Sequence, residues 1–443
     1  MATRTPEDIV RIVREKNIHF IRMQFTDIFG QLKNVTLPAS QIEKAVRGKI
    51  MFDGSSIEGY TRIEESDQYL RPDLDTFAVL PWDQEVGISA RMVCDVCNPD
   101  GTPFAGDPRG VLHRVLQEAA DMGYVFNVGP ECEFFLFKTD AEGKPTVHTN
   151  DEVGYFDQGP LDTAALTRQR ICLALEELGF EIEASHHENA AGQHEIDFKY
   201  ADALTAADNI MTFKLAVKTI AQKDGLHATF MPKPIFGAAG NGMHINMSLF
   251  RNGRNDFYDE NDPRGLSVSA YQFIAGVLEH VPAICALTNP LVNSYKRLVP
   301  GYEAPCYVSW STGNRSALIR VPSPRGSATR LELRNPDPSC NPYLALAVCL
   351  AAGLDGIRRG LTPPPEITEN IYRLSAAERR AKGVRSLPAS LDAAINALRD
   401  DELVCSVLGT HALLQYLIGK EEEWTSYCTR VSSWEIERYI TNY

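Results

Sequence analysis

The sequence has little that would place it in a membrane or outside the cell. No uninterrupted apolar run approaches the roughly 20 residues of a membrane-spanning helix, and the charged start MATRTPEDIVRIVREKN lacks the apolar centre of a secretory signal. The ten cysteines show no disulfide-framework spacing, and the C-x-x-C pair of Cys94 and Cys97 has no second pair to complete a zinc or redox site. These absences predict reduced thiols, a cytoplasmic protein and no membrane partner.

Positive charge is also in short supply. The chain has 44 Lys and Arg against 58 Asp and Glu, a formal net charge of −14 at pH 7. This balance argues against nucleic acid or an anionic membrane as the main partner, although local arginines can still bind an anionic substrate. With 443 residues, 44% of them hydrophobic, and no internal repeat, we expect a globular protein of two or three domains.

The N-terminal part has the pattern of a small α+β domain. We predict a helix over residues 6–16, capped by Thr5 with Pro6 in the first turn, and then strands between residues 18 and 37. Residues 51–60 and the charged segment after them have the composition of a turn-rich loop. The segment NPDGTPFAGDP, rich in Pro and Gly, is the best candidate for a linker and predicts that the domain ends near residue 100.

The longer C-terminal part alternates helical and strand-like patterns, which again indicates an α+β fold. Predicted helices cover residues 109–123, 163–179, 203–223, 267–287 and 341–359.

One stretch, KPIFGAAGNGMHINMS (233–248), combines three glycines with a strand pattern. The glycines permit positive φ and the close approach of a ligand. Met243, Ile245 and Met247 then alternate with His244, Asn246 and Ser248, which predicts a strand with an apolar back and a polar front. Because the glycine loop leads into a strand and not a helix, a dinucleotide fingerprint or P-loop is disfavoured.

Carboxylates recur on predicted strand faces. Each glutamate alone is better explained by a solvated face, but a group of them is costly to bury without a cation. One imidazole among oxygen ligands favours Mg²⁺ or Mn²⁺, and six ligands suffice for two ions that clamp a transferring phosphoryl group. The six candidates are Glu131, Glu133, Glu188, Glu195, Glu332 and His244.

Arginines crowd one span of this acidic chain. Guanidinium groups suit carboxylates and phosphates, and five of the arginines in a 38-residue span are candidates: Arg297, Arg315, Arg320, Arg330 and Arg334. We expect Arg330 to be a surface arginine paired with exposed acids. His186 and His187 are adjacent on a predicted strand, so they face opposite ways and cannot both bind one metal ion.

Seven motifs in order along nearly the whole chain resemble glutamine synthetase of the bacterial and archaeal type I, alpha subtype. They are DGSSIEGY, GPECEFFLF, ENAAGQHEID, KPIFGAAGNGMHINMS, NSYKRLVPGYEAP, NRSALIRVP and LELRNPDPSCNPY. The resemblance implies an enzyme that ligates ammonium to the γ-carboxylate of L-glutamate. ATP is its co-substrate and γ-glutamyl phosphate the intermediate. It also implies an N-terminal β-grasp domain (1–104), followed by a catalytic domain (105–443) with a curved, mainly antiparallel sheet.

The resemblance further assigns roles to individual residues. One Mg²⁺ or Mn²⁺ ion would be held by Glu133, Glu188 and Glu195, and another by Glu131, His244 and Glu332. Glutamate would bind Gly240, Arg297 and Arg334, and the nucleotide and its phosphates Tyr200, Ser248, Arg315 and Arg320. The ammonium site would comprise Asp53, Ser56, Tyr155 and Glu188, with Asp53 contributed by a neighbouring subunit.

Three further implications concern the lid, regulation and assembly. Glu303 would close over the intermediate and help to accept a proton, and Arg62 would contribute to feedback inhibition by glutamine. The family assembly is a dodecamer of two hexameric rings with shared active sites, and regulatory proteins are possible partners. Ala239 stands where many members carry Asn, and the sequence around Tyr372 differs from the adenylylated segment of the longer subtype.

Two alternatives stay open at this point. A γ-glutamyl–amine ligase would use an organic amine, whereas Asp53-Gly54-Ser55-Ser56 and Tyr155 favour the small ammonium cation. A catalytically silent sensor would not need a full ligand set and a lid.

Overall fold

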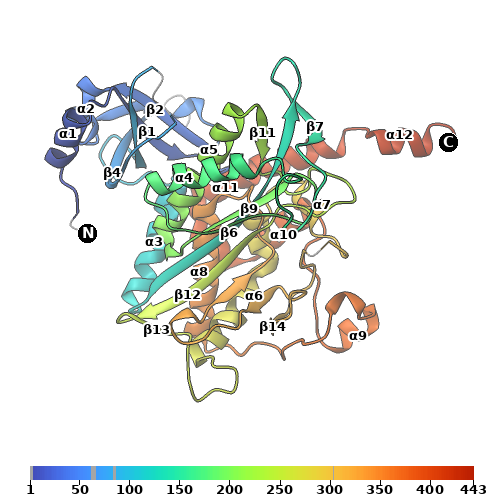
Figure 1. The fold of residues 1–443 in the computed structure, drawn as a ribbon. Coiled ribbons are helices and arrows are strands. Elements are labelled where there is room, and N and C mark those ends of the chain that lie inside the picture. The colour runs from blue at the N-terminus through green and yellow to red at the C-terminus, as the bar shows by residue number, and fades with distance from the viewer. Residues whose placement is uncertain (1–2, 61–65, 83–85, 303) are drawn as a thin grey trace.

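The computed structural model describes residues 3–60, 66–82, 86–302 and 304–443. Its first helix, α1 (Pro6–Glu15), begins as predicted: the side chain of Thr5 accepts a hydrogen bond from the backbone N–H of Asp8, and Pro6 occupies the first turn. Val13 and Ile9 of α1 are buried beneath the smaller of two sheets. This N-terminal part lies at the upper left of Figure 1.

The smaller sheet has five described strands in the order β2-β1-β5-β4-β3. Strands β1 and β5 run parallel, and the other neighbours are antiparallel. The strands are β1 (Phe20–Thr26), β2 (Leu32–Pro38), β3 (Ile50–Asp53), β4 (Asp67–Val79) and β5 (Ser89–Cys97), with the short helices η1 (Ala39–Gln41), α2 (Ile42–Ala45) and η2 (Gly54–Ser56) between them.

The loop predicted from residue 51 onward is wrong in two places. Met51 to Asp53 belong to β3. Asp67, where the described part of the charged segment continues, begins the 13-residue strand β4. Met51 pairs with Tyr69 across these two strands, so cross-strand pairing outweighs the local turn and charge signals.

The larger sheet carries the remaining strands and is antiparallel throughout, except between β14 and β15. Its main path runs β14-β15-β16-β12-β6-β9-β8, and β7, β10 and β11 also pair with β6 while β13 pairs with β12. The strands are β6 (Val125–Thr139), β7 (Pro145–Thr149), β8 (Ile182–His187), β9 (Gln193–Phe198), β10 (Ala201–Asp202), β11 (Leu226–Thr229), β12 (Met243–Arg251), β13 (Arg254–Asn255), β14 (Trp310–Thr312), β15 (Ile319–Val321) and β16 (Leu331–Leu333).

Most helices follow the predicted ranges closely. The described helices after β5 are α3 (Pro108–Asp121), α4 (Ala165–Glu177), α5 (Ala203–Lys223), α6 (Val268–Thr288), α7 (Ser294–Arg297), η4 (Gly326–Ala328), α8 (Pro342–Arg359), η5 (Ile371–Arg373), α9 (Ala376–Ala381), α10 (Leu391–Asp400), α11 (Glu402–Cys428) and α12 (Ser433–Tyr439). In Figure 1, α12 extends away from the body of the molecule and ends at the C-terminus. Two sheets with helices packed around them confirm the α+β class.

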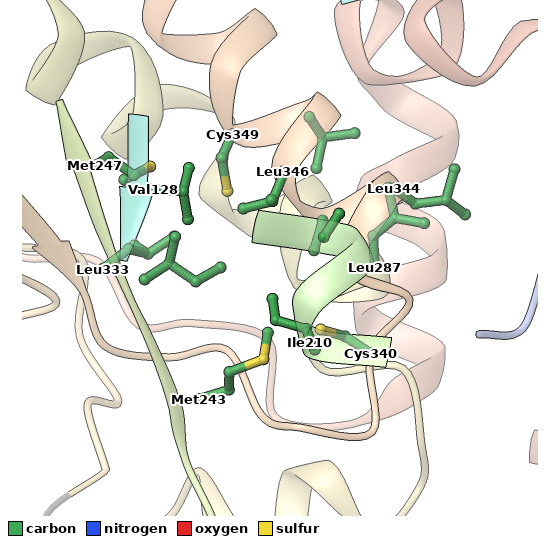
Figure 2. Close-up of a cluster of buried hydrophobic side chains, with 14 of the residues drawn as sticks. Val128, Ile210, Met243, Met247, Leu287, Leu333, Cys340, Leu344, Leu346 and Cys349 are labelled. Atoms are coloured by element: carbon green, nitrogen blue, oxygen red, sulfur yellow. The ribbon is translucent and has the colours of Figure 1, made fainter. Parts of the chain in front are cut away.

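The main core lies between the larger sheet and the helices behind it. Figure 2 shows Met243 and Met247 of β12, with Val128 of β6, facing Ile210 of α5 and Leu346 of α8. All five residues are buried, each 0% exposed. This confirms the apolar back predicted for β12, and it leaves the polar side chains of the strand on the opposite face.

A largely buried cluster of charges joins the smaller sheet to helices α3 and α5. Arg109, on α3, forms ion pairs with Asp73 of β4 (2.7 Å), Asp95 of β5 (2.7 Å) and Asp208 of α5 (2.9 Å). The hydroxyl of Tyr343 donates a further hydrogen bond to Asp208 at 2.7 Å. We call these residues the Arg109 junction.

By length and composition, α6 and the segment Glu402–Tyr439 could each cross a membrane. Of the most apolar window in α6, however, 78% is buried inside the protein, which identifies it as a core helix; the second segment is 28% buried.

Candidate active site

Strand register brings the predicted metal ligands to one face of the larger sheet. Glu131 of β6 lies opposite His244 of β12, and Glu133 lies opposite Glu195 of β9. Because residues two apart on a strand point the same way, Glu131 and Glu133 share the face opposite the core. Glu332 enters from β16, on the other side of β12.

The first ligand group consists of Glu131, His244 and Glu332, whose ligand atoms all lie within 4.8 Å of one another. The Nδ1 atom of His244 lies 3.1 Å from Glu131 Oε2 and 3.7 Å from Glu332 Oε1. Burial lowers the pKa of His244, and the charge of Arg334 lowers it further. Both effects favour the neutral imidazole, which is the form that binds a metal.

The carboxylates of this first group are fixed from behind by basic side chains. Glu332 is fully buried; it accepts a hydrogen bond from Arg334 Nη1 at 2.5 Å and another from Arg320. Burial pushes the pKa of Glu131 up, but hydrogen bonds with His244 and Asn246 outweigh it and lower that pKa to about 2. The Glu131 carboxylate is therefore held in the ionised form.

The second ligand group, Glu133, Glu188 and Glu195, has a different electrostatic character. Burial and the charge of Glu188 raise the pKa of Glu133 to about 8. Burial, followed by the charge of Glu133, raises the pKa of Glu195 well above its usual value. A set of buried carboxylates that repel one another fits a divalent cation, which would neutralise them.

The glycine loop closes over Glu133. The backbone N–H of Gly242 donates to Glu133 Oε2 at 2.9 Å, and a Cβ at this position would lie 2.5 Å from Arg297 Nη2. At Gly240 a Cβ would lie 2.3 Å from the carbonyl oxygen of Pro232. Of the three glycines, only Gly237 adopts a positive φ, 80°, so the other two serve close approach alone.

The predicted arginines occupy three kinds of position. Arg297 is buried and donates to the backbone carbonyl oxygens of Asn335 (2.7 Å) and Arg334 (3.2 Å). Arg334 and Arg320 both contact Glu332. Arg315 is exposed, and its charge acts on Tyr155.

A cavity of about 490 Å³ opens beside the first ligand group. Its lining includes the predicted nucleotide residues Tyr200 and Ser248, together with Glu131 and Arg330. The prediction that Arg330 is an ordinary surface arginine is wrong: its Nε donates to Asn246 Oδ1 at 3.1 Å inside this cavity. Spacing along the chain could not reveal this partner, which lies 84 residues away.

The residues predicted to bind ammonium lie in two separate regions: Tyr155 and Glu188 lie near the second ligand group, and Asp53 and Ser56 lie in the smaller domain. Tyr155 stacks on Phe156, with ring centroids 4.1 Å apart, and meets His186 edge-on at 5.6 Å. Burial, and then the charge of Glu188, raises its pKa, so these two candidates act on each other. Asp53 and Ser56 lie at the end of β3, and the described hydrogen bonds of Asp53 stay within its own turn, to Ser55 and Ser56.

Two predicted residues, Glu303 and Arg62, lie outside the described residues. Sequence reasoning also missed Asp197, which pairs with Glu131 across β6 and β9 and whose pKa is raised to about 7, first by burial and then by Glu131. Its position two residues after Glu195 on an alternating strand was the available signal.

The opposite orientation predicted for the adjacent histidines is confirmed. His186 approaches Glu195 (3.8 Å) on the ligand face, whereas His187 points to Asp151 (3.0 Å) behind it. Away from this site, Cys94 and Cys97 on β5 are buried free thiols, as are most of the cysteines.

Comparison with known proteins places this geometry in a family. The profile of the glutamine synthetase catalytic domain matches residues 105–439, and that of the glutamine synthetase beta-Grasp domain matches residues 17–99. The chain belongs to the glutamine synthetase family. The β-grasp assignment of the smaller sheet is thereby confirmed.

Full-length relatives agree with the family. The chain is 59% identical to a glutamine synthetase of Clostridium saccharobutylicum, covering 100% of both chains, and 56% identical to one of Staphylococcus aureus, covering 100% of this chain and 99% of the relative.

Solved structures share the fold. A chain described as a GmaS/ADP complex is 34% identical, with a TM-score of 0.90, covering 98% of this chain and 99% of its own. Plasmodium falciparum glutamine synthetase, solved by cryo-electron microscopy, is 25% identical, with a TM-score of 0.87 and 99% of each chain covered.

Proposed function

We propose that this chain is an ATP-dependent glutamate–ammonia ligase, which forms L-glutamine, ADP and phosphate through γ-glutamyl phosphate. The observation that carries the proposal is the ligand group of Glu131, His244 and Glu332 beside the mutually repelling Glu133 and Glu195 on one sheet face, in a chain that is 59% identical over its full length to a glutamine synthetase. Phosphoryl transfer depends mainly on positioning and charge neutralisation, and the site is built from groups that do both.

Two or more Mg²⁺ or Mn²⁺ ions complete the proposed site. Glu133, Glu188 and Glu195 would hold one ion, and Glu131, His244 and Glu332 another. When bound, the metals supply positive charge to the phosphoryl oxygens. The raised pKa values of Glu133 and Glu195 support a cation at the second ligand group.

Substrate contacts come from this chain's own residues. We assign Gly240, Arg297 and Arg334 to L-glutamate. ATP and its phosphates are assigned to four residues, Tyr200, Ser248, Arg315 and Arg320, and we add Arg330 because it lines the same cavity as Tyr200. The ADP in the printed description of the GmaS neighbour is consistent with a nucleotide there.

The remaining assignments concern ammonium, the lid and assembly. Tyr155 and Glu188 would meet Asp53 and Ser56 of a neighbouring subunit, in a dodecamer of two hexameric rings. The Asp53 carboxylate accepts hydrogen bonds from Ser55 in its own turn, and this turn is the part that we expect to face the neighbouring subunit. Glu303 would close the site and Arg62 transmit feedback by glutamine.

We also assign the chain a boundary between residues 104 and 105 and a cytoplasmic location, with neither nucleic acid nor membrane as a partner. Regulatory proteins remain candidate partners of the assembly.

The function is tested by phosphate release in the presence of ATP, Mg²⁺ and L-glutamate, comparing ammonium with a panel of organic amines. We expect release to require ammonium and to yield glutamine as the product. Turnover only with an organic amine would instead identify a γ-glutamyl–amine ligase, while no turnover with any nitrogen donor would favour a silent sensor.

A further inference from the structure

Behind the second ligand group lies a buried chain of polar side chains that the proposed catalytic roles do not use. His187 and His194 are each 0% exposed, and Asp151 is 8% exposed. The ligand atoms of these three residues lie within 4.8 Å of one another. The position of Arg168, whose Nη1 lies 2.9 Å from His194 Nδ1, excludes a metal here, because a guanidinium cation would face it directly.

The proton positions in this chain follow from the partners of each ring. His187 Nδ1 lies 2.7 Å from the backbone carbonyl oxygen of Glu188, and its Nε2 lies 3.0 Å from Asp151 Oδ1. The carbonyl oxygen can only accept a hydrogen bond, so Nδ1 donates to it, while Nε2 faces the Asp151 carboxylate.

The Asp151–His187 pair holds both ends of the turn between β8 and β9. His187 binds the carbonyl oxygen of Glu188, the first residue of the turn, while Asp151 Oδ1 accepts the backbone N–H of Gly192 at 3.0 Å. The turn cannot shift easily at that end, since a Cβ on Gly192 would lie 2.9 Å from the carbonyl oxygen of Leu136.

We infer that the hydrogen-bonded pair of Asp151 and His187 is a positioning element for Glu188 and thereby sets the affinity of one of the two proposed metal sites. The inference rests on the proposed metal roles under "Proposed function". The pair acts only on the turn that carries Glu188, whereas Glu131, His244 and Glu332 lie on β6, β12 and β16. Residues that orient metal ligands typically change metal affinity by about 10–100-fold when removed.

The test measures Mn²⁺ binding directly, by electron paramagnetic resonance of the free ion, with no substrate present. Asp151→Leu has a similar side-chain volume but removes the carboxylate that contacts His187 and Gly192. His187→Phe removes the ring nitrogen that donates to the carbonyl oxygen of Glu188. In each variant we expect one class of Mn²⁺ site to weaken at least about tenfold while the other class changes less than about threefold. Asp151→Asn should weaken the site less than Asp151→Leu, because its amide oxygen can take the place of Oδ1 beside His187 and Gly192, although its NH2 group then meets the donating Nδ2 of Asn150.

A matched control is Asp140→Ala. Asp140 also ties a turn, through the backbone N–H groups of Glu142 (3.0 Å) and Lys144 (2.7 Å), but its turn between β6 and β7 carries no proposed ligand. We expect both Mn²⁺ classes to be unchanged in this variant.

The remaining outcomes overturn the inference. Equal weakening of both classes, or failure of both Asp151→Leu and His187→Phe to fold while Asp140→Ala folds, would show that the pair supports the fold as a whole. Folded variants with two unchanged classes would show that Glu188 needs no such support. If the wild-type protein bound no Mn²⁺, the proposed metal site itself would fail along with the inference, whereas normal binding without ligase activity would contradict only the proposed function.

Discussion

Two buried groups of carboxylates in this protein have opposite electrostatic balance. At the Arg109 junction, three aspartates surround one guanidinium at 2.7–2.9 Å. Burial raises the pKa of Asp95, but His113 and Arg109 outweigh it and hold that pKa below its usual value. At the second ligand group, burial and like charges raise the pKa of Glu133 and Glu195.

The difference separates a charge cluster that stabilises the fold from one that we propose binds a metal ion. The chain itself supplies the cation at the junction, so that cluster is complete. The glutamates oppose one another on strands β6 and β9, and the fold retains them although their repulsion costs stability. Carboxylates that remain repulsive in the folded chain indicate a cation from outside.

The largest expected effect comes from removing the junction's own cation. Arg109→Met leaves buried aspartates uncompensated and should lower the free energy of unfolding by about 3–5 kcal/mol. The measurement is the urea midpoint of the purified protein. Arg109→Lys is the control: it keeps the charge but loses the planar fork that contacts three carboxylates, so we expect an intermediate loss. An unchanged urea midpoint in Arg109→Met would show that the Arg109 junction does not stabilise the fold.

The corresponding change at the ligand group should affect catalysis and spare stability. Glu133→Gln removes one of the repelling charges, so the metal-free variant should unfold at the same or a higher urea concentration than wild type. Its ligase rate should fall about 10²–10³-fold, the usual cost of losing one group that organises charge in a transition state. Glu181→Gln, an exposed glutamate paired with Lys199, is the control and should leave the rate unchanged. Marked destabilisation of Glu133→Gln would mean that Glu133 is structural.

The pattern of the sequence predicted which residues face the core and which face the candidate site, although the composition alone does not. Alternation along β12 assigned Met243 to the core and His244 to the site, because a strand with one buried face has period two. The six candidate ligands were predicted as a group for the same reason: each stands on a strand face or directly after a strand.

What the sequence could not predict depends on contacts between distant segments. Arg330 was misassigned because its partner Asn246 is on another strand, and Asp151 reaches His187 from 36 residues away. Strand β4 was predicted only from Phe77 onward, because its earlier residues are rich in charge while its hydrogen bonds come from β3 and β5. Local composition carries no information about these pairings.

The two clusters should also respond oppositely to pH. Because the pKa values of Glu133 and Glu195 are raised on folding, their contribution to stability is fully present below the usual value of 4.5 and is lost as pH rises through the raised values. The lowered pKa of Asp95 gives a contribution that is present above its usual value and is lost as pH falls. Metal-free protein should therefore have a lower unfolding midpoint at pH 8.5 than at pH 6.

Mg²⁺ should remove this loss, since the cation favours the ionised carboxylates. A Mg²⁺ concentration about 100 times the dissociation constant at pH 6 should stabilise the protein by about 2.7 kcal/mol at that pH. The same concentration should stabilise it more at pH 8.5, because fewer protons compete with Mg²⁺ for the carboxylates. Thermal unfolding with EDTA and with Mg²⁺ at both pH values measures the effect. Equal stabilisation at the two pH values would contradict the raised pKa values.

The smallest expected effect belongs to a third buried cluster, in which a histidine is the cation. His280 of α6 lies 2.7 Å from Asp401 and 3.2 Å from Asp355, so both ring nitrogens face carboxylates. Burial lowers the pKa of His280, but these two aspartates outweigh it and raise it. The stabilising charge is fully present below the usual value of 6.5 and is lost as pH rises through the raised pKa.

His280→Gln should abolish this dependence while keeping a side chain that can hydrogen-bond. With saturating Mg²⁺, which removes the contribution of the glutamates, the variant should be less stable than wild type at pH 6, and the difference should shrink by pH 9. A difference that stays constant across this range would show that His280 contributes packing alone. The balance of charge would then not explain stability at the third cluster, and the contrast between the first two would rest on the Arg109 junction and the metal ligands themselves.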